Sequence, residues 1–256
     1  MLFETIQLQF QGIERIEQTV AALRSSGVGV FRIACTPALA LGVLPQVLEV
    51  FTKAWPNVHS NVQTLGSRAI REGLRQGMYD VAVTNNLLDG SEFLSQVVHS
   101  SEAVCVMSLD HALAARAVID ASDLQRHPLI SLEHGDALEA ELRKVLADMG
   151  LTISPAIETI YYATICAFAA QGLGLGVVNP YMAAVFKDRL AIRRFTPLIT
   201  VKTYVTFARF SPASELAERF VEALNSRMQS SEWTTPFTPR EPNRRRSHDA
   251  SIDRTT

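Results

Sequence analysis

The sequence has few cysteines and no pattern that would organise them. Its 256 residues include three cysteines, Cys35, Cys105 and Cys166, which lie far apart among apolar neighbours. No CxxC pair and no cysteine–histidine spacing typical of a zinc site occurs, so we expect no metal and no other cofactor. Isolated cysteines of this kind are typical of buried, reduced thiols, which favours a cytoplasmic protein.

Long apolar runs and an excess of charge of one sign are also absent. No apolar run approaches the roughly 20 residues that span a bilayer, so we expect no membrane partner. The N-terminal stretch MLFETIQLQFQGIERIEQ is interrupted by polar side chains and lacks the pattern of a signal peptide. The formal net charge of -2 argues against strong nucleic-acid binding by these residues. The 47% hydrophobic content is typical of a globular protein.

The first half of the chain alternates between strand and helix patterns. VFRIAC predicts a buried strand, and TPALALGVLPQVLEVFTKAWP predicts one helix with Leu41, Leu44, Leu48 and Phe51 toward the core. VHSNVQTL, a helix beginning near Ser67, and DVAVT follow. Strands and helices in this order, with short connections, predict an α/β fold with a parallel sheet.

The second half repeats this alternation after a long β-rich segment, and the two ends of the sequence have patterns of their own. VVHSSEAVCVMSL is a long β-rich segment that we interpret as passing from one lobe to another. Residues 1–26 carry apolar side chains at steps of three and four and predict a helix that needs a partner. Residues 229–256 are rich in proline, threonine, serine and charge and predict a disordered tail.

The stretch QGLGLGVVNP places glycine at every second position, at Gly172, Gly174 and Gly176. A phosphate-binding glycine run follows a strand and opens a helix. Here a predicted helix comes first, Gly172 ends it, and LGLGVV enters a strand. The pattern therefore predicts a helix cap followed by close approach of another backbone, a ligand or a packed helix, and argues against a nucleotide site.

Polar residues follow the predicted strands in both halves. In an open parallel sheet, ligands bind at the carboxyl ends of strands, beside the helices that follow. The mixture of hydroxyls, amides and charges at these junctions suits a small zwitterion or carboxylate, although Thr36 and Ser67 are equally explained as helix N-caps. The candidate ligand-binding residues are Thr36, Pro37, Ser67, Arg68, Asn85, Glu133, Tyr162 and Asn179.

Cys35 raises the alternative of an enzyme. It directly precedes a predicted helix N-terminus, which lowers a thiol pKa when the thiol is accessible. No histidine is recognisably paired with it, so we expect no catalytic residue and no enzymatic activity.

Three segments together resemble the effector-binding domain of LysR-type transcriptional regulators. They are residues 31–84, which begin FRIACTPALALGVLP, the segment DHALAARAVIDASDLQRHPLISL, and FAAQGLGLGVVNP. The resemblance implies two α/β subdomains joined by crossing strands, like a periplasmic binding protein, with an effector in the cleft. It places a linker helix at 1–26, subdomain I at 28–105 plus 209–228, subdomain II at 106–208 and a tail at 229–256.

The resemblance also carries expectations about the ligand. Thr36 and Ser67 match effector positions, and the edge of the second subdomain would supply residues near Glu133, Tyr162 and Asn179. RIACTPALA and RFTP are similar to the opine- and lysine-related branch of the family. This similarity implies an amino acid, an opine or another carboxylate as effector.

The sequence departs from the family at its N-terminus. A full regulator begins with a winged helix-turn-helix, whereas this sequence opens inside what resembles the linker helix. We therefore expect effector sensing and a homodimer or tetramer, with DNA contacted only through a module not present in these residues. The alternatives are a free-standing cytosolic solute-binding protein, or effector sink, and an α/β enzyme that uses Cys35.

Overall fold

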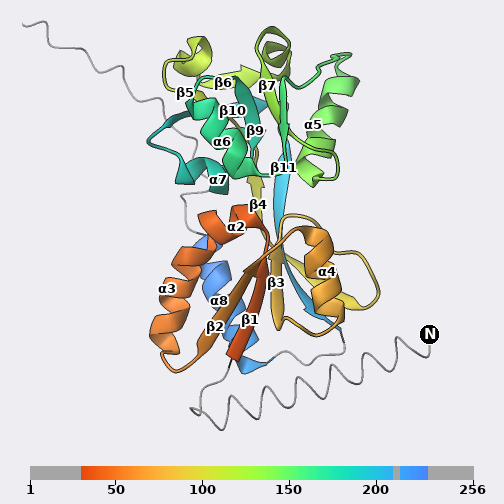
Figure 1. Ribbon diagram of the computed structural model, residues 1–256, viewed down its shortest axis with the longest axis vertical. Helices are drawn as coiled ribbons and strands as arrows, with labels where there is room; N and C mark the ends of the chain where they lie inside the picture. The colour runs from red at the N-terminus through yellow and green to blue at the C-terminus, as the bar shows by residue number, and fades with distance from the viewer. Residues whose placement is uncertain (1–29, 210–213, 230–256) are drawn as a thin grey trace, which may run out of the picture.

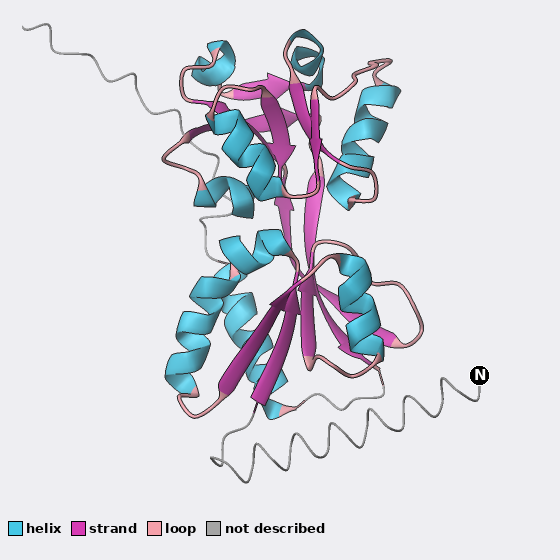
Figure 2. Ribbon diagram, in the orientation of Figure 1, coloured by secondary structure: helices cyan, strands magenta, loops and turns pink. Residues whose placement is uncertain are grey.

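The computed structural model describes residues 30–209 and 214–229, which form two lobes along the long axis of the molecule (Figure 1). The expected linker helix at 1–26 and the expected tail from 230 onward lie outside the described residues. Each lobe is a β-sheet flanked by helices (Figure 2). No helix in the described part of the chain has the length and apolar character of a bilayer-spanning segment.

The first lobe contains a five-stranded sheet in the order β2-β1-β3-β11-β4. Strand β1 runs parallel to β2 and β3, as the alternation of strands and helices predicts, and β11 runs antiparallel to β3 and β4. All residues of β3 are buried, as expected for an interior strand covered on both faces. The elements are β1 (Val30–Cys35), α2 (Pro37–Gly42), α3 (Leu44–Ala54), β2 (His59–Thr64), α4 (Ser67–Arg75), β3 (Val81–Thr84), β4 (Phe93–Glu102), β11 (Thr200–Ala208) and α8 (Glu215–Met228).

The second lobe contains a six-stranded sheet in the order β6-β10-β5-β9-β7-β8. Strands β7, β8 and β9 are parallel, and β5 is antiparallel to both β9 and β10. The elements are β5 (Val104–Ser108), η1 (Ala112–Ala115), β6 (Val118–Asp120), η2 (Ala121–Arg126), β7 (Leu129–Leu132), α5 (Ala137–Asp148), β8 (Ile157–Thr159), α6 (Tyr162–Ala170), β9 (Leu175–Val178), α7 (Pro180–Val185) and β10 (Leu190–Thr196).

The helix predicted from Pro37 onward is in fact two helices. It breaks at Val43, between α2 and α3. A continuous helix would place Pro45 in its interior, where the ring removes a backbone hydrogen bond and collides with the preceding turn. The break also changes the buried face: Leu41, predicted to be in the core, is 53% exposed, whereas Leu39 is buried.

The predicted subdomain limits differ from the limits of the two sheets. Strand β11 lies within the expected second subdomain, 106–208, yet every one of its residues pairs with β4 of the first sheet. Cys105, expected in the first subdomain, lies in β5 of the second sheet. An alternating pattern identifies a strand but not its pairing partner, so the sequence alone could not assign these residues.

The glycine-rich stretch has the structural role that its order predicts. Helix α6 ends at Ala170, and Gly172 follows it with a φ of 79°, a conformation that favours glycine at a helix end. At Gly176 in β9, a Cβ atom would lie 2.2 Å from the side chain of Ile165 on α6. The absence of a side chain there lets the helix pack directly on the strand.

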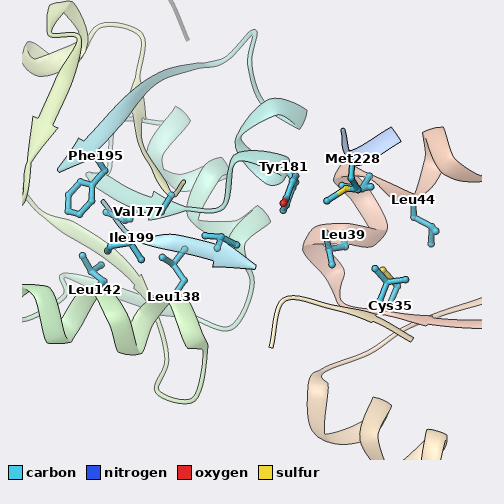
Figure 3. Close-up of a cluster of buried hydrophobic side chains, with 14 of the residues drawn as sticks. Cys35, Leu39, Leu44, Leu138, Leu142, Val177, Tyr181, Phe195, Ile199 and Met228 are labelled. Atoms are coloured by element: carbon cyan, nitrogen blue, oxygen red, sulfur yellow. The ribbon is translucent and has the colours of Figure 1, made fainter. Parts of the chain in front are cut away.

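The two lobes are joined by crossing strands and by a buried tyrosine. The chain passes between the lobes from β4 to β5 and from β10 to β11 (Figure 1). Tyr181 on α7 is fully buried, and its hydroxyl accepts hydrogen bonds from Ser101 on β4 and Thr203 on β11, at 3.1 and 3.2 Å. Figure 3 shows Tyr181 between apolar side chains of the two lobes, such as Leu39 and Leu138.

Candidate functional site

A cavity of about 340 Å³ lies between the two lobes. Its walls are the turns that follow β1, β2 and β3 in the first lobe and those that follow β7 and β8 in the second. The structure brings seven of the eight candidate ligand-binding residues to this cleft. They are Thr36, Pro37, Ser67, Arg68, Asn85, Glu133 and Tyr162.

The eighth candidate, Asn179, does not line the main cleft. It lines a smaller neighbouring cavity of about 90 Å³ beside β11. Asn179 is the N-cap of α7, and its side-chain oxygen accepts a hydrogen bond of 2.9 Å from the backbone of Met182. Its amide nitrogen is buried and has no hydrogen-bond partner among the described residues.

Thr36 does not cap the helix that it precedes. Its backbone occupies the N-cap position of α2, but its side chain makes no capping hydrogen bond. The hydroxyl oxygen is buried and has no partner in the described part of the chain. Because buried polar groups are nearly always paired, this hydroxyl calls for a partner that enters the cleft.

Ser67 does not cap its helix either. The N-cap of α4 is Gly66, and Ser67 is the first helical residue. Its hydroxyl accepts a hydrogen bond of 3.2 Å from the side-chain amide of Asn86. The two capping interpretations are therefore wrong, although both residues line the cleft.

Asn86 connects the first lobe to the second. Its side-chain nitrogen donates to Ser67, and its side-chain oxygen accepts a hydrogen bond of 3.3 Å from the backbone of Ala137, at the start of α5. The candidate predicted from the sequence is instead Asn85, whose side chain donates to the backbone of Lys202 on β11 at 3.3 Å. Both asparagines follow β3 directly, so the junction is visible in the sequence but the choice between them is not.

The second lobe contributes two carboxylates with different surroundings. Asp136 caps α5, accepting hydrogen bonds from the backbone of Leu138 and Glu139 at 2.8 and 3.3 Å, and also accepts one from the hydroxyl of Tyr162. Glu133 is exposed, and among the described residues its carboxylate has no hydrogen bond or ion pair. Asp136 is thus internally satisfied, whereas Glu133 is available to a ligand.

Tyr162 is a fixed donor in this wall. Burial and the negative charge of Asp136 raise the pKa of Tyr162 well above its usual range. The hydroxyl therefore keeps its proton at neutral pH and directs it to Asp136. Tyr162 is among the residues predicted from the sequence, whereas Asp136 is not, because its contact with Tyr162 joins two different strand–helix junctions.

The environment of Cys35 does not favour a nucleophile. Burial raises its pKa far above the ordinary value of a thiol, because the charged thiolate would be desolvated. The same cause raises the pKa of Cys166 to about 12. A thiol that stays protonated at neutral pH is a poor nucleophile, so the Cys35 alternative has no structural support. Within the described ranges, no group of three histidine, cysteine or acidic side chains is placed to hold a metal ion.

Two α/β lobes joined by crossing strands, with a polar cleft at the carboxyl ends of strands from both, define a class of domain that binds small molecules between its lobes. The LysR substrate binding domain family matches residues 24–229. The chain belongs to this family, and its two lobes form a LysR-type effector-binding domain, which binds small-molecule effectors.

Known proteins similar to this chain are regulators. It is 26% identical over 236 residues to the regulatory protein NocR of Agrobacterium tumefaciens (strain T37), covering 92% of this chain and 79% of NocR. It is 24% identical over 225 residues to the octopine catabolism/uptake operon regulatory protein OccR of Rhizobium meliloti, covering 88% of this chain and 74% of OccR.

A solved structure confirms the periplasmic-binding-protein-like fold. The regulatory domain of CcmR from Synechocystis PCC6803, in complex with 2-PG, superposes with a TM-score of 0.69 at 17% identity. The match covers 78% of this chain and 98% of that domain. The homologues are transcriptional regulators rather than enzymes, in line with the interpretation of Cys35 as a buried structural thiol.

Proposed function

We propose that this chain is the effector-sensing part of a LysR-type transcriptional regulator and that its cleft binds a small amino-acid or opine-like carboxylate. The observation that carries the proposal is the hydroxyl of Thr36, which is buried at the cleft wall without a partner among the described residues. A carboxylate oxygen of a ligand would accept the hydrogen bond that this hydroxyl lacks.

The charges on the two walls support a zwitterionic ligand. Arg68 lines the cleft from the first lobe and Glu133 from the second, and neither side chain has an ion-pair partner among the described residues. A ligand carboxylate would lie against Thr36, Ser67 and Arg68, near the N-terminus of α4, which stabilises an anion by about 0.3–1 kcal/mol. A ligand ammonium would face Glu133.

The relatives support the opine part of the proposal. OccR is named for an operon of octopine catabolism and uptake, and octopine combines an amino-acid head with a second carboxylate. The regulatory domain of CcmR holds its small molecule, 2-PG, on the same fold. This chain would accordingly act in the cytoplasm, as a homodimer or tetramer, and reach DNA through a helix-turn-helix outside these residues.

Sensing would follow from a shift between lobe orientations. A ligand that contacts both walls binds a closed arrangement better than an open one, and it therefore shifts the population toward closure. Couplings of this kind typically amount to about 1–3 kcal/mol. A free-standing solute-binding protein would bind the same ligand without passing this shift to a DNA-binding module.

The test is a ligand screen on the full 256-residue chain. Thermal unfolding is recorded with the common amino acids, octopine and other opines, and each hit is titrated by calorimetry. Thr36→Val and Ser67→Ala should weaken binding of the hit, whereas Ser91→Ala, an exposed serine that lines neither cavity, should not. Unchanged affinity in both cleft variants would place the ligand elsewhere.

A further inference from the structure

The cavity of about 90 Å³ adjoins the main cleft and has walls from both lobes. The second lobe contributes residues of α5, Tyr162 and Asn179, and the first sheet contributes residues of β11. Four residues line both cavities and form the boundary between them: Asn85 and Asn86 from the first lobe, and Asp136 and Tyr162 from the second.

The size of this cavity limits what it can hold. A water molecule takes up roughly 30 Å³, so the space is equivalent to about three waters. It accommodates a terminal polar group but not a whole amino acid. Because the two cavities share these boundary residues, one extended molecule can have its head in the main cleft and its far end in the smaller cavity.

The side chain of Asn179 indicates which group would occupy this space. It is 1% exposed, and its oxygen is committed to capping α7 through the backbone N–H of Met182. This bond fixes the orientation of the amide, because the exchanged orientation would set an NH₂ group against an N–H donor. The amide nitrogen is consequently directed away from the helix, buried and without a partner among the described residues. It needs a hydrogen-bond acceptor.

The charges around the cavity favour an anionic acceptor near Asn179. Lys202 on β11 is a wall residue, and its ammonium group has no ion pair among the described residues. Of the two acidic residues in the walls, Asp136 is occupied by two backbone N–H groups and the hydroxyl of Tyr162, and Glu141 is exposed on α5. Asn179 and Lys202 thus both line the cavity and each carries a donor that no described residue occupies.

We propose that this cavity is a subsite for a second, distal carboxylate of the effector, bound by the amide of Asn179 and the ammonium of Lys202. The inference rests on the proposed function, since the other end of the same molecule lies in the main cleft. It narrows the ligand class to amino acids and opine-like compounds with a carboxylate at each end.

The experiment compares matched ligands by calorimetry on the full chain. Each pair has the same L-amino-acid head and carbon number but ends in a carboxylate or a methyl group: glutamate and norvaline, 2-aminoadipate and norleucine, and 2-aminopimelate and 2-aminoheptanoate. In at least one pair, the dicarboxylate should bind at least about tenfold more tightly, because a site built to hydrogen-bond one group rejects an analogue that lacks it.

Asn179→Asp is the decisive variant. Aspartate caps a helix as well as asparagine does, so the start of α7 is preserved. The substitution replaces the free donor with a negatively charged oxygen that repels a carboxylate. It should abolish the preference for the dicarboxylate and leave the affinity for the methyl partner within about twofold. Lys202→Met, at an exposed position, should reduce the same preference without affecting folding.

The outcomes separate this inference from the proposed function. If amino acids bind but no pair shows a preference, or if the preference survives Asn179→Asp, the subsite is overturned and the proposed function stands. If neither these probes nor any opine binds, both are overturned. Thr36→Val should weaken both members of the preferred pair equally, since it acts on their common head.

Discussion

The side-chain amide of Asn86 donates a hydrogen bond of 3.2 Å to the hydroxyl of Ser67, and its oxygen accepts one from α5 across the cleft. A residue on the cleft wall is thereby connected to a helix of the other lobe. This one side chain therefore links Ser67 to the start of α5. Contacts of this kind allow a ligand at Ser67 to bias the arrangement of the lobes.

Replacing Asn86 with alanine should loosen the cleft. Asn86→Ala removes the acceptor for the backbone of Ala137 and the donor to Ser67, so we expect a loss of about 1 kcal/mol in unfolding free energy. The radius of gyration from small-angle X-ray scattering should increase as the lobes separate. Asn61→Ala, at an exposed position on β2, is the control. An unchanged radius in Asn86→Ala would contradict the role of this link.

Replacing Thr36 with valine should stabilise the protein. Valine has the shape of threonine but no hydroxyl, so Thr36→Val removes a buried group that lacks a partner and should raise the unfolding free energy by about 1 kcal/mol. Thr206 is the control, because this residue is fully buried and its hydroxyl shares a hydrogen bond of 2.9 Å with Ser95. Thr206→Val should therefore destabilise. Urea denaturation measures both, and a destabilised Thr36→Val would show that its hydroxyl is paired.

Replacing Gly42 with alanine should disturb the contact between α2 and α7. A Cβ atom at Gly42 would lie 2.7 Å from the carbonyl oxygen of Tyr181, closer than real contacts allow. The helices, and with them the lobes, must move apart, at a cost of about 1–3 kcal/mol in unfolding free energy. Gly66→Ala should cost much less, because a Cβ there meets no atom within 4 Å. Equal losses in the two variants would argue against a tight contact.

His99 should make the stability depend on pH. It lies on β4, with its ring centroid 6.2 Å from that of Tyr181, and burial lowers its pKa. The unfolded chain takes up this proton at about pH 6.5, before the native state does. The unfolded state therefore binds more protons in acid, so the stability is fully present above about pH 6.5 and is lost as the pH falls below it.

The pH prediction is checked by urea denaturation at about pH 7.5 and about pH 5.5. The drop in unfolding free energy between the two should be smaller in His99→Phe than in the wild type. His59→Phe serves as control, because His59 is exposed on β2. The same drop in His99→Phe and the wild type would mean that other groups cause the acid sensitivity.

Local sequence patterns predict much of the fold and the general location of the site. The β-rich run at Val30–Cys35 and the Thr36–Pro37 boundary mark β1 and α2, because strand composition and helix starts depend on neighbouring residues. The carboxyl ends of parallel strands meet at one edge, so residues as far apart in the sequence as Thr36 and Glu133 could be expected in one cleft.

Features that depend on contacts between residues far apart in the sequence could not be predicted. The pairing of β11, the hydrogen bonds of Asn86 and the position of Asn179 in a separate cavity all involve residues distant in sequence. The prediction that Thr36 and Ser67 cap their helices was wrong for a related reason. A cap is suggested by residue type, but whether the hydroxyl turns toward its own helix depends on what surrounds it.

The position of β11 between β3 and β4 has a consequence for biosynthesis. The strands of the second sheet, from Val104 to Thr196, form one continuous segment, whereas the first sheet needs a strand that leaves the ribosome only after that segment is complete. Because domains fold as units during synthesis, the second lobe can complete its sheet while the first sheet still lacks the strand between β3 and β4. The lobe whose synthesis begins first can thus complete its sheet only after the other lobe. The crossing strands that join the two lobes are completed in the same step.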